Sequence, residues 1–177
     1  RANLELTETL RGREKRGTLL WVLDKTQTAM GKRLVRTWVE QPLLDVAAIQ
    51  ARLDAVEELY GKNVLRADVR DTLSHVFDME RLMTRVIYGS ASPREIYALA
   101  STCGYLPSLL ALLAGCSSDG LCTIHGAIDS LQDIKELIET AIDENAPASM
   151  KEGGVIRTGY NSDVDELRDI MHGGKGY

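Results

Sequence analysis

Apolar residues between Thr18 and Leu43 recur at three- and four-residue steps along the chain. The apolar positions are Leu19, Val22, Leu23, Met30, Leu34, Val35 and Trp38. The charged positions, mostly on the opposite side of a helical projection, are Asp24, Lys25, Lys32, Arg36 and Glu40. This spacing predicts one amphipathic helix over 18–39, roughly 33 Å long at about 1.5 Å per residue. Pro42 ends it, because proline lacks an amide donor and disfavours helical geometry at the preceding residue.

The same periodicity predicts three further helices. Asp45 is a candidate N-cap for a helix that ends at Gly61. Asp78 is a candidate N-cap for a second helix, which ends at Gly89. A third helix lies between them. The apolar positions of the three are, in chain order, Ile49, Leu53, Val56 and Tyr60; Leu65, Val69, Leu73 and Val76; and Met79, Leu82, Met83 and Val86.

The dipeptide Ser92-Pro93, with Glu95 in the following turn, is typical of a helix start. Its apolar series continues to Leu113, with a bend expected near Gly104 and Pro107. The predicted helix over 93–113 is the longest one in the second half of the chain.

The C-terminal part alternates loops and helices. Residues 116–126 are rich in Gly and Ser and predict a loop, and the apolar spacing over 129–143 predicts a helix. Ser162 or Asp163 would cap a last helix close to the end of the sequence.

Two segments, Leu4-Glu5-Leu6 and Val155-Ile156, have an extended pattern. We find no repeat of 20 to 50 residues. The sequence therefore predicts an all-α domain over residues 1–177 with at most a small β element.

Length and composition narrow the class of protein to which this chain can belong. A chain of 177 residues suits one domain with a sizeable core. It has no uninterrupted apolar run of about 18 residues and no apolar N-terminal stretch of the signal-peptide kind. Three cysteines, without a Cys-x-x-Cys pair, favour reduced thiols over a disulfide framework. We expect a cytoplasmic protein.

The run Gly12-Arg13-Glu14-Lys15-Arg16-Gly17-Thr18 has the glycine spacing of a phosphate-binding loop. It carries Thr18 where that motif requires lysine, and no hydrophobic strand precedes Gly12. A solvent-facing basic turn is the stronger interpretation, so we expect no ATP bound in this way.

Other residues that could carry chemistry have ordinary explanations. Cys116, Cys122 and His125 could be drawn as zinc ligands, but their spacing is not that of a zinc knuckle. His75 and His172 have no nucleophile beside them in a known motif. We assign no catalytic, cofactor-binding or metal-binding residue.

Nucleic-acid contact also has little support. The net charge of −5 is unlike that of a domain that binds nucleic acid alone. A basic run could touch phosphates, although a solvated turn explains it better: Arg11, Arg13, Lys15 and Arg16. An acidic face would repel a duplex: Asp133, Glu136, Glu139, Asp143 and Glu144. Phe77 is interpreted as a core residue, and no DNA-contacting residue is identified.

Several ordered blocks of the chain resemble the core, or lever, domain of the bacterial MutS DNA mismatch-repair proteins. The blocks are Asn3-Leu4-Glu5-Leu6-Thr7-Glu8-Thr9-Leu10, Gly17-Thr18-Leu19-Leu20-Trp21-Val22-Leu23-Asp24, Thr28-Ala29-Met30-Gly31-Lys32-Arg33-Leu34, Asp78-Met79-Glu80-Arg81-Leu82, Gly159-Tyr160-Asn161 and Asp165-Glu166-Leu167-Arg168. They cover nearly the whole chain, and the likeness is weakest around Gly115 to Gly126.

The resemblance implies the N-terminal part of this domain, ending before the clamp insertion, with a lever between the DNA-binding and ATPase parts. ATP and magnesium would belong to other domains of the full-length protein. Its implied partners are mismatched double-stranded DNA, a MutL-type protein and a second copy in a homodimer. On the lever helix, structural roles are expected for Leu19, Leu23, Leu34 and Trp38, with Gly31 allowing a close approach or slight bend.

Two interpretations from other classes stay open. A free-standing helical protein-interaction module would expose an apolar strip, and a small enzyme would bring titratable groups together in a cleft. Within the resembled family, the parent could recognise mismatches or act in meiosis or recombination.

Overall fold

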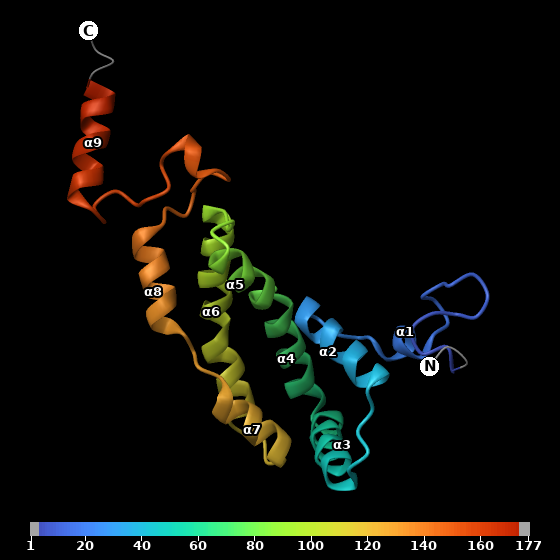
Figure 1. Ribbon diagram of the computed structural model, residues 1–177. Helices are drawn as coiled ribbons and strands as arrows, with labels where there is room; N and C mark the ends of the chain where they lie inside the picture. The colour runs from blue at the N-terminus through green and yellow to red at the C-terminus, as the bar shows by residue number, and fades with distance from the viewer. Residues whose placement is uncertain (1–3, 174–177) are drawn as a thin grey trace. The chain divides into compact units, whose positions relative to one another are not determined.

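The computed structural model describes residues 4–173 (Figure 1). The chain divides into two compact units. Unit 1 is Arg1–Glu80 with Tyr105–Ser130, and unit 2 is Arg81–Gly104 with Leu131–Tyr177. Apart from one isolated antiparallel bridge, between Ile142 and Ile156, the regular structure of residues 4–173 is helical. The predicted all-α class with a small β element is confirmed.

Most helices belong wholly to one unit. Unit 1 contains α1 (Leu19–Leu23), α2 (Ala29–Glu40), α3 (Val46–Gly61), α4 (Asn63–Ser74) and α7 (Asp119–Ala127). Unit 2 contains α8 (Gln132–Ala141), the short 3-10 helix η2 (Met150–Glu152) and α9 (Ser162–Gly173). The chain passes between the units inside α5 (Met79–Ile87) and α6 (Pro93–Leu113).

The core of unit 1 forms where α3 and α7 pack together. Leu109, Leu113 and Leu121 are buried there. Around them lie the partly buried side chains of Ala55, Leu59, Val69, Leu73, Cys116 and Ile128. Gly120 allows the close approach, because a Cβ there would lie 3.4 Å from both the Ala51 carbonyl oxygen and the Ala55 Cβ.

The first half of α6 supplies the core of unit 2. Ala100, Thr102 and Cys103 are fully buried, and Ile138 of α8 is also buried. Gln132 donates from Nε2 to the Cys103 carbonyl oxygen at 2.9 Å. Of the described helices, α6 alone is long and apolar enough to cross a membrane by length and composition, a criterion that buried core helices also meet.

Several predicted caps are confirmed. Asp45 accepts a hydrogen bond from the Ala48 amide at 2.9 Å. Ser92 and Glu95 form a capping box, with the Ser92 amide donating to Glu95 Oε2 at 2.8 Å and the Glu95 amide donating to Ser92 Oγ at 3.3 Å. The last helix is present, but Asn161 caps it, because its side-chain oxygen accepts from the Asp163 and Val164 amides.

The single helix predicted over 18–39 is wrong. The chain leaves helical geometry after Leu23, where the Asp24 carboxylate accepts from the Thr26 amide at 3.3 Å and the Thr26 hydroxyl at 2.7 Å. Helix α2 then starts afresh, with Thr28 accepting from the Gly31 amide at 2.9 Å. Short polar side chains that bond to nearby amides compete with helix continuation, so the apolar period runs across a break that it does not reveal.

This break changes the roles expected on that segment. Leu19, Leu23, Leu34 and Trp38 are exposed by about half within the described structure. At Gly31 the nearest neighbours belong to the capped turn, since a Cβ there would lie 3.0 Å from Thr28 Oγ1 and 3.4 Å from Thr26 Cβ.

Three further predictions are corrected. Residues 119–127 form α7 where a loop was expected, because burial of Leu121 outweighs a Gly- and Ser-rich composition. Phe77 is 52% exposed in the turn before α5, so it is not a core residue. The segment Leu4-Glu5-Leu6 is not extended, since Glu5 has a φ of 45°.

The carboxylate of Glu58 joins α3 to the start of α7. It accepts from Lys62 Nζ at 2.7 Å and from the Ser117 and Ser118 amides, each at 2.8 Å. A carboxylate is favourable at a helix N-terminus, where amides point outward without partners. The hydrogen bonds from Lys62 and then Ser118 hold the pKa of Glu58 well below its ordinary value of 4.5.

Because the pKa of Glu58 is lower in the folded chain, its stabilising effect is present above about pH 4.5 and is lost as the pH falls further. We therefore expect Glu58→Gln to lower the melting temperature at pH 7, with the deficit shrinking below about pH 4.5. Circular dichroism melts from pH 3 to pH 7 check this. Glu57→Gln is the matched control, and an equal deficit for both variants at pH 7 would contradict the role of Glu58.

The Thr28 cap allows a test of the helix break. Thr28→Ala removes the hydroxyl that accepts from Gly31 and should cost about 1 kcal/mol in the free energy of unfolding. Thr37 lies inside α2 and donates only to the Arg33 carbonyl oxygen, at 3.1 Å, so Thr37→Ala should be neutral or slightly stabilising. Urea titrations measure both. Equal costs at the two positions would mean that Thr28 is an ordinary helical residue.

Candidate functional site

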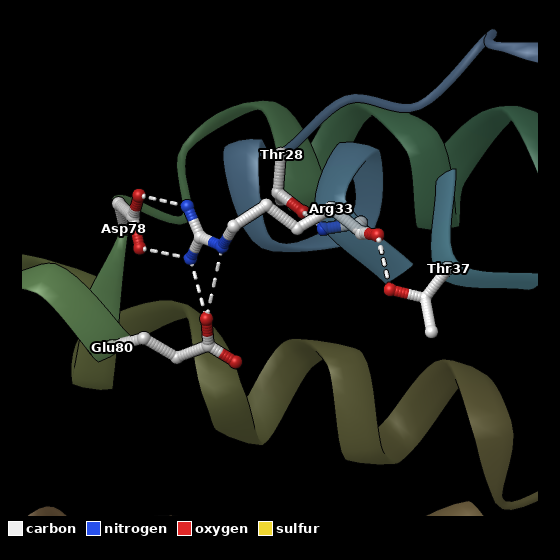
Figure 2. Close-up of polar contacts among 6 residues, drawn as sticks. Thr28, Arg33, Thr37, Asp78 and Glu80 are labelled. Carbon is white, nitrogen blue, oxygen red and sulfur yellow. Dashed lines mark hydrogen bonds and ion pairs between the residues drawn. The ribbon is translucent and has the colours of Figure 1, made fainter. Parts of the chain in front are cut away.

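The guanidinium of Arg33, on α2, makes four hydrogen bonds to carboxylates distant in sequence. Its Nη1 and Nη2 donate to the two carboxylate oxygens of Asp78, each at 2.7 Å (Figure 2). Its Nε donates to Glu80 Oε2 at 3.1 Å, and Nη2 donates to the same oxygen. One planar cation thus joins α2 to two carboxylates at the start of α5, and we call these three residues the Arg33 clamp.

The clamp has the geometry that arginine favours. A guanidinium presents its donors in a rigid fork, and two parallel bonds to one carboxylate fix orientation as well as distance. The hydrogen bonds that Arg33 donates to Asp78 and then to Glu80 raise its pKa above the ordinary value. Arg33 and Glu80 are well exposed, so their pair adds little stability, whereas the two parallel bonds to the mostly covered Asp78 add more.

The clamp lies where the chain leaves unit 1. Asp78 is in the turn before α5, and Glu80 is the last residue of unit 1 before α5 continues into unit 2. In Figure 2, the side chain of Arg33 extends from α2 directly toward both carboxylates. A change in the position of α2 would therefore act on the first turn of α5.

A cleft of about 300 Å³ lies beside the clamp. It is lined by the loop before α1, by α1 and by α2. Asp24 Oδ2, in the turn after α1, lies 3.4 Å from Lys32 Nζ, and within α2 Arg36 Nε lies 2.8 Å from Glu40 Oε1. The hydrogen bonds from Thr26, and to a smaller extent Lys32, lower the pKa of Asp24.

The segment with phosphate-loop spacing is an exposed turn. Gly12 and Gly17 have φ values of 87° and 92°. The Thr18 side chain is buried, donates to the Lys15 carbonyl oxygen at 2.8 Å and accepts from the Trp21 amide at 3.2 Å. Thr18 therefore caps α1, and the side chains of Arg11, Arg13, Lys15 and Arg16 are exposed around it.

The remaining sequence candidates make contacts of their own, and none of these contacts is to the clamp residues. His75 stacks on Tyr105 with ring centroids 4.6 Å apart, and its Nδ1 lies 3.0 Å from the Asp71 carbonyl oxygen. Cys122 Sγ lies 3.5 Å from the Cys116 carbonyl oxygen, and burial raises the pKa of the Cys116 thiol. His125 is in the last turn of α7. The side chain of His172 lies outside the described residues.

On the predicted acidic face of α8, Lys135 pairs with Glu139 at 2.8 Å. Among residues 4–173, no group of three or more His, Cys, Asp or Glu side chains is arranged to hold a metal ion.

Sequence reasoning did not identify the clamp. Arg33, Asp78 and Glu80 fall inside two of the quoted blocks, yet 45 residues separate Arg33 from Asp78. The only available signal was an arginine on α2 and two acidic residues around a predicted helix start. Neither pattern indicates that Arg33 contacts Asp78 and Glu80 in the fold.

Comparison with known proteins assigns the family. The model of the family described as MutS domain III matches residues 1–172. The chain is 48% identical over 175 residues to the DNA mismatch repair protein MutS of Lachnoclostridium phytofermentans, covering 99% of the chain and 19% of that protein. It is 48% identical over 177 residues to MutS of Desulfitobacterium hafniense and 45% identical over 175 residues to MutS of Alkaliphilus oremlandii, covering 100% and 99% of the chain and 20% of each relative.

The chain thus spans about a fifth of the length of these curated relatives. The match runs through both segments that form the Arg33 clamp. With nearly half of its residues shared over almost its whole length, the chain belongs to the MutS domain III family.

Proposed function

We propose that this chain is the lever segment of a full-length MutS-type mismatch-repair protein, and that it transmits conformational change between DNA-binding and ATPase parts. The observation that supports this is the Arg33 clamp, which ties α2 to α5 at the point where the chain leaves unit 1. Coupling between distant sites requires an element whose arrangement both sites can bias. The clamp is a discrete connection of that kind.

The break after Leu23 changes how such a lever would work. A single helix over 18–39 would move as one rigid body. Instead, α1 and α2 are separate helices joined by a capped turn at 24–28. A movement at the N-terminal end would reorient α2 about this turn. The Arg33 clamp would then carry the movement to the first turn of α5, because its paired hydrogen bonds resist reorientation.

In this proposal the chain itself performs no chemistry. ATP, magnesium and their hydrolysis belong to other parts of the full-length protein, as does recognition of mismatched DNA. A homodimer and a MutL-type repair protein are further proposed partners, and the cytoplasm is the proposed location.

A second candidate, a free-standing helical interaction module, has one observation in its favour. The apolar side chains of α3 at Val46, Leu53, Val56 and Tyr60 are more than half exposed. Exposed apolar surface commonly meets a partner. The same surface is expected of a segment that covers a fifth of its relatives, so family membership makes the lever the better supported proposal.

The clamp can be tested in the full-length protein by Arg33→Lys. Lysine keeps the charge but loses the paired bonds to Asp78, so the connection becomes loose. We expect nucleotide binding and DNA binding to survive, with the DNA-dependent change in ATP turnover clearly reduced. Steady-state ATPase rates with and without mismatched duplex measure this.

Arg36→Lys is the matched control, because Arg36 pairs with Glu40 inside the same helix. It should leave the DNA effect intact. The proposal fails if Arg33→Lys, confirmed as folded by circular dichroism, retains the full effect of DNA on the ATPase rate.

The chain alone should bind DNA poorly. Its exposed basic turn can meet phosphates only by charge, and the whole chain carries a net charge of −5. We expect weak, salt-sensitive binding without mismatch preference, measured by fluorescence anisotropy of labelled duplexes. Tight preference for a G·T mismatch near physiological salt would show that the chain itself recognises DNA.

A further inference from the structure

The cleft beside the Arg33 clamp has an apolar lining. It lies between the loop before α1, α1 itself and α2, with a volume of about 300 Å³. Leu20 and Trp21 line it, and the Trp21 side chain is 49% exposed. This volume is at the lower end of ligand sites in proteins, roughly 300 to 1,000 Å³. Because tryptophan combines a large apolar area with few rotatable bonds, it is enriched at interfaces.

Cations surround this lining. Lys15, Lys32 and Arg36 contribute to the cleft, together with Asp24, which pairs with Lys32. Arg16 Cζ lies 6.0 Å and Lys25 Nζ 5.9 Å from the centroid of the Trp21 ring. The occupant of such a cleft would combine an apolar group with negative charge.

The charge of this region is opposite to that of the rest of the chain. Residues 1–43 contain nine Lys and Arg against five Asp and Glu, whereas residues 44–177 contain 12 against 21. A local basic surface on an acidic chain attracts acidic partners selectively, because complementary charge guides association and fixes register.

We propose that this cleft docks an acidic segment of the same full-length polypeptide, from outside residues 1–177, with one large apolar side chain seated against Leu20 and Trp21. The segment's carboxylates would lie near Lys15 and Lys25. About four fifths of the length of the curated relatives has no counterpart in this chain, which leaves ample sequence to supply the segment.

A nucleic acid fits the same surface less well. Lys32, Arg33 and Arg36 are already paired with Asp24, Asp78, Glu80 and Glu40, so a nucleic acid, which carries a phosphate at every nucleotide, would meet mostly compensated charge here. A short acidic segment needs only a few of these cations, and its apolar side chain uses the lining.

Hydroxyl-radical footprinting with mass spectrometry can test the docking at a single residue. The rate of Trp21 oxidation is compared between the 177-residue chain and the purified full-length protein, at several protein concentrations. We expect Trp21 to be oxidised several-fold more slowly in the full-length protein, without nucleic acid or any other protein and independently of concentration.

The chemistry of the occupant is tested by Lys15→Glu combined with Lys25→Glu in the full-length protein. Both residues are exposed, so the fold should survive, and the oxidation of Trp21 should rise toward its rate in the isolated chain. Lys15→Arg with Lys25→Arg should keep the protection. Lys151→Glu reverses an exposed charge in unit 2 and is the control for charge reversal outside the cleft.

Equal oxidation of Trp21 in the chain and the full-length protein would overturn the proposal. Protection that ignores charge reversal would exclude an acidic occupant, and protection that grows with concentration would assign the cleft to a second molecule. Protection that appears only with added DNA would assign it to nucleic acid. The readout requires no ATP turnover, so it can succeed or fail independently of the lever proposal.

Discussion

The guanidinium of Arg33 bonds to two carboxylates at once, and the route of the chain out of unit 1 is fixed at that point. Asp78 receives two parallel hydrogen bonds of 2.7 Å, and Glu80 opens the first turn of α5. A single ion pair on a surface holds distance but little orientation. The paired bonds hold both, so the short helix α2 and the start of α5 form one connected element.

The local structure around the clamp depends on short polar side chains. Thr18 caps α1, Asp24 closes the turn with Thr26, and Thr28 starts α2. These bonds set the direction in which α2 leaves the turn and therefore where Arg33 can reach. Glu58 has a similar role in the core of unit 1, where it fixes the start of α7 on α3.

The sequence predicted several local caps, but it predicted no contact between residues that are distant along the chain. Asp45 and the pair Ser92 and Glu95 were found, because a cap and its amide lie within three residues of each other. The break at 24–28 was missed, since the apolar period is the same on both sides. The helix α7 was missed because its evidence is the burial of Leu121 and the contact of Gly120 with α3, which composition does not show. The family could be recognised from ordered blocks, but the meeting of Arg33 with Asp78 is a product of the fold.

A double-mutant cycle on Arg33 and Asp78 tests the clamp most directly. Unfolding free energies of Arg33→Ala, Asp78→Ala and the double variant give the coupling energy between the two side chains. Arg36 and Glu40, paired within α2, provide the reference cycle. We predict a coupling energy for Arg33 and Asp78 that is clearly larger than the reference. Additive effects, with no coupling beyond experimental error, would contradict the account, because the two segments would then be held together by other contacts.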